Sequence, residues 1–389
     1  MYNIKTLNKI AAIGTDNFDK SKYNVADEAA NPDAIILRSA DMHSYEFNDN
    51  LQAIARAGAG VNNIPIDRCT EKGIVVFNTP GANANAVKEL ALAALLIASR
   101  DIVGGINWAQ TLKEGCDDVG KAVEKGKSAF TGPELYGKTL GVIGLGAIGA
   151  MVANLGHALG MEVYGYDPYI TVEGAWNLSK TIKRASDKKT IYENCDYICL
   201  HAPVTPETKG SINAEAIASM KEDVRIVNLS RADLVNDEDM AAALESGKVA
   251  RYVTDFPNAA ALQMKNCVSI PHLGASTPES EDNCAVMAVN ELIDFLEHGN
   301  IKNSVNFPDL QNPGAGDISF CVFHKNVPNI IAQISAAFSA ENINIENLSN
   351  RSKKDYAYTV CEILGDYPAS VLDKLNGIDG IIKVNVVKN

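Results

Sequence analysis

A histidine and an arginine stand at two places in this sequence where a polar side chain could do chemistry. His272 follows the strand-like run 268–270, and Arg231 follows the strand-like run 224–228. The carboxyl ends of parallel strands form the ligand-binding edge of a sheet. A guanidinium can hold a carboxylate through two hydrogen bonds and polarise a neighbouring carbonyl, and an imidazole can donate or accept a proton near neutral pH. We therefore expect acid–base chemistry on a 2-oxo or 2-hydroxy acid, with Arg231 and His272 as the catalytic residues.

A glycine pattern upstream of these residues indicates a dinucleotide cofactor, which could exchange a hydride with such an acid. Residues 144–149 read Gly-Leu-Gly-Ala-Ile-Gly, between the strand-like run 140–143 and the helix-compatible run 150–159. The pattern alone is a weak signal, because glycines cluster in many turns. Here Asp167 ends the next strand-like run, which completes the sequence context of a dinucleotide-binding loop.

Each residue of this pattern has a physical role in binding a dinucleotide. Gly144 permits a tight turn, Gly146 lets the backbone approach a pyrophosphate, and Gly149 lets helix and strand pack closely. The N-terminus of the helix favours the diphosphate charge. Asp167 can accept hydrogen bonds from ribose hydroxyls and would repel a 2'-phosphate, so we expect NAD rather than NADP. The alternatives are a glycine turn without a ligand, and Asp167 as an ordinary turn residue before Pro168.

The surrounding pattern predicts an α/β fold. Strand-like runs at 140–143, 162–166, 197–200, 224–228 and 268–270 alternate with helix-compatible segments, which predicts a doubly wound parallel sheet of the Rossmann type. The first ninety or so residues alternate short apolar runs, such as 34–37 and 73–77, with polar segments, and a helix is expected over 281–298.

The C-terminal part is predicted to be a separate module. The stretch 303–316 is rich in turn-forming residues and has no apolar period, so we expect a linker. Beyond it we expect the β-α-β-β-α-β order of a ferredoxin-like unit. The expected strands are 318–323, 343–349, 356–364 and 381–387, and the expected helices are 330–340 and 369–375.

Composition and charge indicate which classes of molecule this protein is expected to bind. The formal net charge is −13, which disfavours sequence-independent binding to nucleic acid or to an anionic membrane. We find neither a transmembrane run nor an export signal, so we expect a cytoplasmic protein that acts on a small molecule. The closest pair of the eight cysteines, Cys195 and Cys199, lacks the spacing of a metal or redox site. We therefore expect buried free thiols and no metal ion.

The segments around Gly144, 201–203, Arg231 and His272 resemble the D-2-hydroxyacid dehydrogenase family over nearly the whole chain. The resemblance implies a flavodoxin-like substrate domain at 1–92 and 282–302, and an NAD-binding Rossmann domain at 93–281. It also implies a linker at 303–316 and a C-terminal ACT domain, a ferredoxin-like amino-acid-binding module, at 317–389. A homodimer or homotetramer is expected.

The resemblance also implies which residues form the sites. Substrate would contact Arg38, Ser39, Gly60 and Asn83, with Arg38 as the anchor for a phosphate or carboxylate. Residues that would line the cofactor are Gly144, Gly146, Ala147, Ile148, Gly149, Asp167, His201, Pro203, Thr208, Leu229, Ser230, Arg231, Asp255, His272, Gly274 and Ala275.

Within this family, the chain looks most like the branch that oxidises 3-phospho-D-glycerate to 3-phosphohydroxypyruvate with NAD, the first step of L-serine biosynthesis. A second possibility is another D-2-hydroxyacid dehydrogenase, such as a glycerate or hydroxypyruvate reductase, which would not need Arg38 as a phosphate anchor. A third is an NAD-sensing interaction protein similar to corepressors, and such a protein would not need an amino-acid-binding module.

One departure concerns the proton donor. The family usually places a glutamate a few residues after the position of Asp255, where it pairs with the catalytic histidine and raises its pKa. Here the segment 255–261 reads Asp-Phe-Pro-Asn-Ala-Ala-Ala, without that carboxylate. We therefore expect that another group orients His272, or that His272 is less basic than in relatives.

The C-terminal loop 324–328, His-Lys-Asn-Val-Pro, resembles the ligand loop of ACT domains. By this resemblance His324, Asn326 and Asn344 would bind L-serine as an inhibitor. Asn329 stands where the family usually has glycine, and asparagine tolerates positive φ better than most residues. The alternative is a ferredoxin-like unit with only an assembly role.

Overall fold

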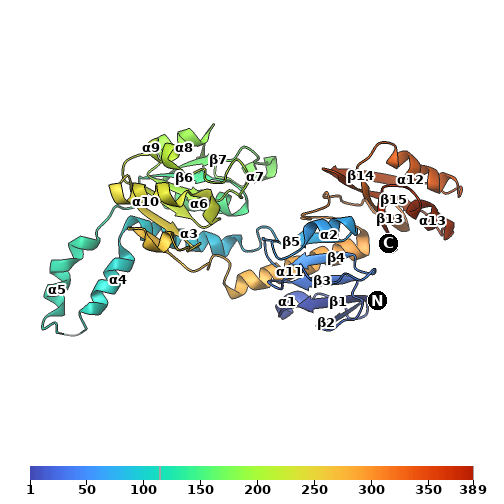
Figure 1. Ribbon diagram of the computed structural model, residues 1–389, viewed down its shortest axis with the longest axis horizontal. Coiled ribbons are helices and arrows are strands. Elements are labelled where there is room, and N and C mark those ends of the chain that lie inside the picture. Colours follow the sequence, from blue (N-terminus) through green and yellow to red (C-terminus); the bar gives the residue numbers. More distant parts are fainter. Residues whose placement is uncertain (114, 389) are drawn as a thin grey trace. The chain divides into compact units, whose positions relative to one another are not determined.

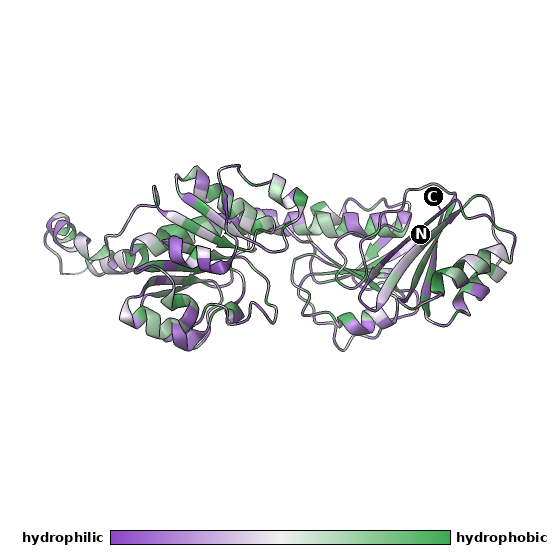
Figure 2. Cartoon of the chain, turned by 90° about the horizontal axis from the view of Figure 1, so that it is seen from above, coloured by the Kyte–Doolittle hydropathy of each residue, from purple (hydrophilic) through white to green (hydrophobic). Residues whose placement is uncertain are grey.

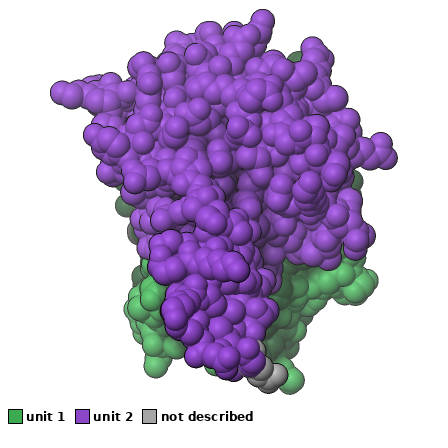
Figure 3. Space-filling view, turned by 90° about the vertical axis from the view of Figure 1, so that its left-hand side faces the viewer, with its two compact units in different colours: residues 1–83, 278–389 green, residues 84–277 purple. Residues whose placement is uncertain are grey.

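The computed structural model describes residues 1–113 and 115–388. The chain forms two compact units, coloured separately in Figure 3. Unit 1 consists of Met1–Asn83 and Pro278–Asn389, and unit 2 consists of Ala84–Thr277. The expected domain limits after residues 92 and 281 fall inside helices α3 (Ala84–Ser99) and α11 (Pro278–His298). Among the described residues, we found no helix long and apolar enough to cross a membrane.

Unit 2 is built on a parallel sheet of seven strands in the order β12-β11-β10-β9-β6-β7-β8. This confirms the predicted α/β class and the predicted alternation of strands and helices. The strands are β6 (Thr139–Ile143), β7 (Glu162–Tyr166), β8 (Lys183–Arg184), β9 (Tyr197–Leu200), β10 (Val224–Asn228), β11 (Val249–Thr254) and β12 (Cys267–Ser269).

Helices cover both faces of this sheet (Figure 1). One face packs against α3 and α6 around Leu140, Val142 and Ala153, and the other packs against α8, α9 and α10 around Ile198 and Ile226. Burial on both faces explains why the central strands β6 and β9 are almost continuously apolar. The helices are α6 (Ala147–Ala158), α7 (Val172–Trp176), α8 (Lys188–Asn194), α9 (Ala214–Ala218) and α10 (Asp237–Ser246), with single turns η2 (Ala232–Leu234) and η3 (Ala261–Gln263).

A helical arm interrupts unit 2 between α3 and β6. It consists of α4 (Ile102–Thr111), α5 (Val119–Gly126) and η1 (Lys127–Phe130). None of the described residues of α4 or α5 is buried, and Ile106 is 55% exposed. Trp108 packs against Phe130 within the arm, with ring centroids 5.4 Å apart. The arm therefore presents apolar side chains that the rest of unit 2 does not cover.

Unit 1 begins with a parallel sheet of five strands in the order β2-β1-β3-β4-β5. Its core contains Ile36, Ala55 and Phe77 of the sheet together with Leu292 and Phe295 of α11. The remaining elements of this part are β1 (Tyr2–Leu7), α1 (Ala12–Thr15), β2 (Tyr23–Ala26), β3 (Ala34–Leu37), β4 (Ala53–Arg56), α2 (Ile66–Glu71) and β5 (Val75–Asn78).

The C-terminal part of unit 1 has the predicted β-α-β-β-α-β order. Its sheet is antiparallel, in the order β14-β15-β13-β16. The elements are β13 (Ile318–Lys325), α12 (Ile330–Ser339), β14 (Asn347–Lys353), β15 (Tyr356–Ile363), α13 (Ser370–Asn376) and β16 (Ile381–Lys388). The prediction of a strand over 343–349 was wrong in position, because Ile343 bonds back to the end of α12 and the strand begins only at Asn347.

The stretch 303–316 differs from the linker that its composition predicts. Phe307 is fully buried and packs against Phe323 of β13, with ring centroids 4.9 Å apart, and Leu310 is buried in the same cluster. Asn306 donates to the carbonyl of Ile74 and accepts from the backbone N–H of Val76. The two sheets of unit 1 thus contribute to one common hydrophobic cluster, and each also has a cluster of its own; Figure 2 shows hydrophobic residues on the strands.

Candidate functional site

The glycine loop has the geometry that its sequence predicts. Gly144 has φ +93°, and a Cβ there would lie 2.6 Å from the carbonyl carbon of His201. A Cβ on Gly149 would lie 1.9 Å from the Gly144 oxygen, so this position also requires glycine. A Cβ on Gly146 would meet none of the described atoms within 4 Å, and Gly146 and Ala147 are exposed where α6 begins. Free N–H groups and an open approach at a helix N-terminus fit a diphosphate.

Asp167 lies at the end of β7, beside this loop. Its carboxylate accepts hydrogen bonds from the backbone N–H of Leu145 at 2.8 Å and from that of Tyr169 at 2.9 Å. A carboxylate has about four lone-pair positions, so two bonds leave capacity for ribose hydroxyls. The two backbone bonds fix the carboxylate beside the glycine loop, which sequence reasoning did not foresee.

The loop after β9 carries the next predicted contacts. His201 lies beneath the glycine turn, its Nε2 is buried without a hydrogen-bond partner among the described residues, and burial lowers its pKa to about 4. The Thr208 hydroxyl donates to the Pro203 carbonyl at 2.6 Å and accepts from the Thr205 N–H at 2.7 Å, which closes the loop. The Ser230 hydroxyl donates to the Ala202 carbonyl at 2.8 Å and so joins this loop to the one after β10.

The two predicted catalytic side chains both pack near one aromatic ring, that of Phe256. The Arg231 guanidinium carbon lies 5.8 Å from the centroid of the Phe256 ring. The His272 ring packs against the same phenyl group, with centroids 4.6 Å apart. Both polar side chains are exposed. Phe256 is the second residue beyond β11, so the rule that selected Arg231 and His272, residues just beyond the carboxyl end of a strand, would also have found it.

Asp255 is the buried carboxylate of this group. It is 1% exposed, its Oδ1 lacks a hydrogen-bond partner among the described residues, and desolvation raises its pKa. The charges of His272 and Arg231 and a hydrogen bond from the Gly274 backbone act in the opposite direction. Asp255 therefore supplies an acidic group within electrostatic range of both predicted catalytic residues, although the family's usual glutamate is missing.

The remaining cofactor-lining predictions also lie on unit 2. Leu229 is buried beneath the sheet edge, and Gly274 is buried against Asp255, where a Cβ would lie 3.2 Å from Oδ2. Ile148 packs on the α3 and α6 side of the core, and Ala275 is half-buried.

The predicted substrate anchor lies in unit 1 and is paired with an acid. Arg38 Nη1 lies 2.6 Å from Glu281 Oε1 at the start of α11, and both side chains are partly exposed. The Asn8 side-chain oxygen accepts from the backbone N–H groups of Arg38, Ser39 and Ala40, at 3.4, 3.1 and 2.8 Å. Sequence reasoning missed Asn8, whose positive φ of 97° is visible only in the structure.

The other two substrate predictions lie on neighbouring loops of unit 1. Gly60 is half-buried in the loop after β4, where the Asn78 side chain donates to the Ala59 carbonyl at 2.6 Å. Asn83 is half-buried and is the last residue of unit 1 before α3 begins.

The predicted serine-binding histidine is built into the C-terminal sheet. His324 is 1% exposed, its Nδ1 lies 2.8 Å from the Lys325 carbonyl, and its Nε2 lies 2.8 Å from the Thr359 hydroxyl. Burial lowers the pKa of His324. The Thr359 hydroxyl also bonds to the Asn350 side chain at 2.8 Å, so His324 belongs to a closed polar network.

The other residues of the predicted ligand loop are accessible. Asn326 donates to the Lys354 carbonyl at 3.1 Å, and Asn344 donates to Glu346 at 2.6 Å, both as exposed contacts. Asn329 has φ +67° at the start of α12, a left-handed conformation that favours glycine. No described contact joins Asn344 to His324.

Comparison with known proteins identifies the family. Residues 92–274 match the family model described as "D-isomer specific 2-hydroxyacid dehydrogenase, NAD binding domain". The chain is 37% identical over 276 residues to the hydroxypyruvate reductase of Thermotoga maritima, an alignment that covers 68% of this chain and 85% of that protein. The chain therefore belongs to the D-2-hydroxyacid dehydrogenase family, and unit 2 contains its NAD-binding domain.

Two further relatives carry a narrower name. The chain is 33% identical over 324 residues to the D-3-phosphoglycerate dehydrogenase of Methanocaldococcus jannaschii, covering 81% of this chain and 59% of that protein. The crystal structure of NAD+-bound 3-phosphoglycerate dehydrogenase in Entamoeba histolytica aligns with a TM-score of 0.60 at 26% identity, covering 79% of this chain and 99% of that one. The chain spans little more than half the length of the curated phosphoglycerate dehydrogenases it matches.

Proposed function

We propose that this protein oxidises 3-phospho-D-glycerate to 3-phosphohydroxypyruvate with NAD. The observation that carries the dehydrogenase chemistry is the group formed by Arg231, Phe256 and His272, with Asp255 buried beneath it. The similarity to curated D-3-phosphoglycerate dehydrogenases supports the choice of substrate.

Each residue of the proposed site has a separate role in the oxidation. Arg231 holds the substrate carboxylate and polarises the oxygen on C2, and His272 accepts the proton of the C2 hydroxyl as the carbonyl forms. Bound NAD+ supplies the acceptor for the hydride that leaves C2. Arg38 binds the phosphate, for which it must release Glu281. Asp255 supplies the acidic group beside His272 in place of the missing glutamate.

One assay tests the reaction and its substrate class. NADH formation is followed with 3-phosphoglycerate, D-glycerate and D-lactate as substrates, and 3-phosphoglycerate is expected to have the highest kcat/KM. Arg38→Gln should raise KM for 3-phosphoglycerate about tenfold or more and leave KM for D-glycerate nearly unchanged. Arg351→Gln, at an exposed arginine of β14, is the matched control. Equal KM values for both substrates in the unmodified protein would refute the phosphate preference.

A second candidate is hydroxypyruvate reduction, which the relative from Thermotoga maritima favours because this chain covers 85% of it. This candidate uses the same Arg231 and His272 but no phosphate anchor. The assay above distinguishes the two, because D-glycerate would then be oxidised as efficiently as 3-phosphoglycerate and Arg38→Gln would have no selective effect.

We further propose that 317–389 is an ACT domain and that 1–92 with 282–302 is a flavodoxin-like substrate domain. The strand order β14-β15-β13-β16 supports a ferredoxin-like unit, and β2-β1-β3-β4-β5 supports the flavodoxin-like order. L-serine is the proposed inhibitory ligand of loop 324–328, through Asn326 and Asn344 and, once its network opens, His324. Calorimetry that detects no L-serine binding at millimolar concentration would reject this ligand.

We also propose that the protein is a homo-oligomer, at least a dimer. The helical arm α4–α5 supports this, because its exposed Ile106 and Val119 have no cover within unit 2. Light scattering coupled to size exclusion should give at least twice the chain mass of 41.6 kDa. A monomer at micromolar concentration would contradict the proposal.

A further inference from the structure

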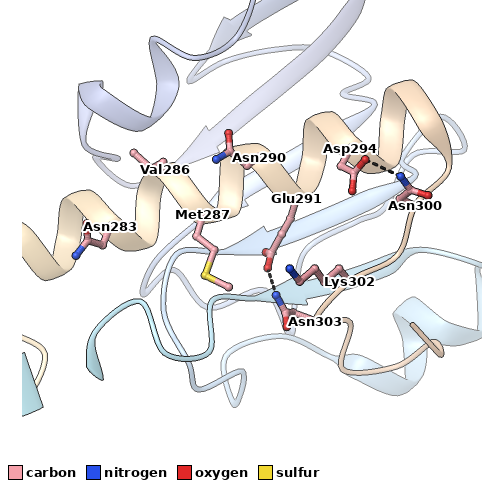
Figure 4. A pocket seen from close by; sticks show the side chains of 9 residues that line it. All are labelled: Asn283, Val286, Met287, Asn290, Glu291, Asp294, Asn300, Lys302 and Asn303. Atoms are coloured by element: carbon pink, nitrogen blue, oxygen red, sulfur yellow. Dashed lines mark hydrogen bonds between the residues drawn. The ribbon is translucent and has the colours of Figure 1, made fainter. Parts of the chain in front are cut away.

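Unit 1 contains a cavity of about 520 Å³ that none of the proposed catalytic, cofactor, substrate or serine-binding residues lines (Figure 4). One wall is a face of α11 that carries Val286, Met287 and Asn290. The other wall is the segment 300–303, which follows the end of the helix. A volume of this size is in the range of small-molecule sites.

Glu291 is the unusual residue of this cavity. Its side chain extends from α11 toward Asn303 and Lys302 (Figure 4) and is only 8% exposed. Oε1 accepts a hydrogen bond from Asn303 Nδ2 at 2.8 Å, whereas Oε2 is buried and has no hydrogen-bond partner among the described residues. A buried carboxylate oxygen without a donor is costly, because it loses hydration and gains nothing in return.

Asn303 donates to this carboxylate, and a chain of hydrogen bonds orders the polar wall beside it. Asp294, one turn further along α11, accepts from Asn300 Nδ2 at 2.8 Å, and the Asn300 oxygen accepts from the Asn312 backbone at 2.6 Å. Asn303 has a left-handed φ of 62°. The polar wall is therefore a hydrogen-bonded frame, in which the buried Glu291 Oε2 is an acceptor without a donor among the described residues.

The charges of the cavity indicate which ligand would complete it. The two acids outnumber the single lysine, Lys302, so the cavity has a formal charge of −1 when all three are ionised. A cationic N–H donor beside Glu291 would supply the missing hydrogen bond and balance this charge. Lys302 and the side chain of Asn290 offer donors to an anionic or polar group at the other end of such a ligand, and Met287 offers apolar contact.

We propose that this cavity binds a small ligand with a protonated amino group, whose N–H donors bond to Glu291 Oε2. Free amino acids and simple diamines both present this chemistry. A free amino acid also carries a carboxylate, which Lys302 would recognise, so it should bind more tightly than a diamine.

The proposal predicts binding that depends on pH. Desolvation raises the pKa of Glu291 to about 8, the Asn303 bond and Lys302 lower it, and Asp309 raises it. Asp294 also lies on this wall. A ligand amine requires ionised Glu291, so binding should release a proton and weaken as pH falls. For a pKa near 8, Kd should rise about fiftyfold from pH 8 to pH 6.

The experiment is calorimetric titration of the full chain at pH 8 with three probes. L-Leucine and putrescine carry the amine, and 4-methylpentanoate is leucine without it. L-Serine is left out, because loop 324–328 is its proposed site. We expect L-leucine to bind with a Kd below 10 mM, putrescine to bind more weakly and 4-methylpentanoate not to bind. Failure of both amines to bind, or binding of 4-methylpentanoate as tight as that of L-leucine, would overturn the proposal.

Two variants locate the site. Glu291→Gln keeps the shape and the acceptor for Asn303, and should weaken L-leucine binding at least tenfold and abolish its pH dependence. Met287→Trp fills the cavity from its apolar side and should also weaken binding, while Glu291 remains. Asp282→Asn, on the same helix but outside the cavity, is the control and should bind like the unmodified protein. Unchanged L-leucine affinity in folded Glu291→Gln would refute the assignment to this cavity.

Discussion

Two histidines of this protein lie in segments that a sequence pattern predicts to be functional, and they differ in burial. His272, beyond β12, is exposed and rests against Phe256. His324, at the end of β13, is 1% exposed, and both of its ring nitrogens contact groups of the C-terminal part. A residue that takes a proton from the substrate must be accessible to it, whereas a buried histidine with two partners first stabilises the fold. The motif identifies a residue type, and burial determines what that residue is free to do.

The largest effect is expected when the exposed imidazole ring of His272 is removed. His272→Ala should lower kcat about a hundredfold or more, because general acid–base catalysis contributes roughly 10² to 10⁴, while the melting temperature changes little. Steady-state kinetics of NADH formation measure the effect. His43→Ala, at another exposed histidine, is the control. Turnover within about tenfold of the parent would end the assignment of His272 as the proton acceptor.

Removing the buried imidazole ring of His324 should instead affect stability and leave turnover nearly unchanged. His324→Ala should reduce the free energy of unfolding by about 1–3 kcal/mol, because the Thr359 hydroxyl and the Lys325 carbonyl lose a partner in a buried site. Denaturant unfolding measures the loss, and kcat should stay within about twofold. Unchanged stability would show that the network around His324 is not structural.

A third test uses the pH dependence of stability at His201. Burial lowers the pKa of His201 from 6.5 to about 4, so the unfolded chain binds a proton at higher pH than the folded one. The stability that depends on the neutral, buried His201 ring is fully present above pH 6.5, and it is lost as pH falls toward 4. Between pH 7.5 and pH 5 the unmodified protein should lose about 2 kcal/mol more than His201→Gln. Denaturant unfolding at both pH values measures the difference. If the unmodified protein and His201→Gln lost the same free energy of unfolding, the His201 ring would be exposed to solvent.

The smallest effect is expected at Asn329, which begins α12 of the proposed ACT domain with φ +67°. Asn329→Gly should leave stability within about 0.5 kcal/mol, whereas Asn329→Ala should cost about 1 kcal/mol, because a Cβ is unfavourable in this conformation. Thermal unfolding of the pair gives the difference directly. Equal stabilities would mean that the left-handed conformation is not retained.

Much of the fold was predictable because its rules are local. Strands 162–166, 197–200 and 224–228 were predicted at the limits the structure has, since each is a short run rich in apolar and β-branched or aromatic residues. The stretch 303–316 was not, because its turn-forming residues hide Phe307 and Leu310, which are buried only through partners far away in the sequence. The strand expected over 343–349 failed for a related reason, since propensity does not locate the first cross-strand pair, Asn347 with Glu362.

The sequence by itself determined the glycine turn, the position of Asp167 and the strand ends that carry Arg231 and His272, because sterics and chain direction act over a few residues. Only the tertiary structure decided that Phe256 packs near the last two, that Asp255 is buried beside them and that Glu291 keeps a buried oxygen without a donor among the described residues. These outcomes depend on which distant side chains exclude water from a given atom. Burial sets both hydrogen-bond satisfaction and pKa, and it is a property of the packed chain.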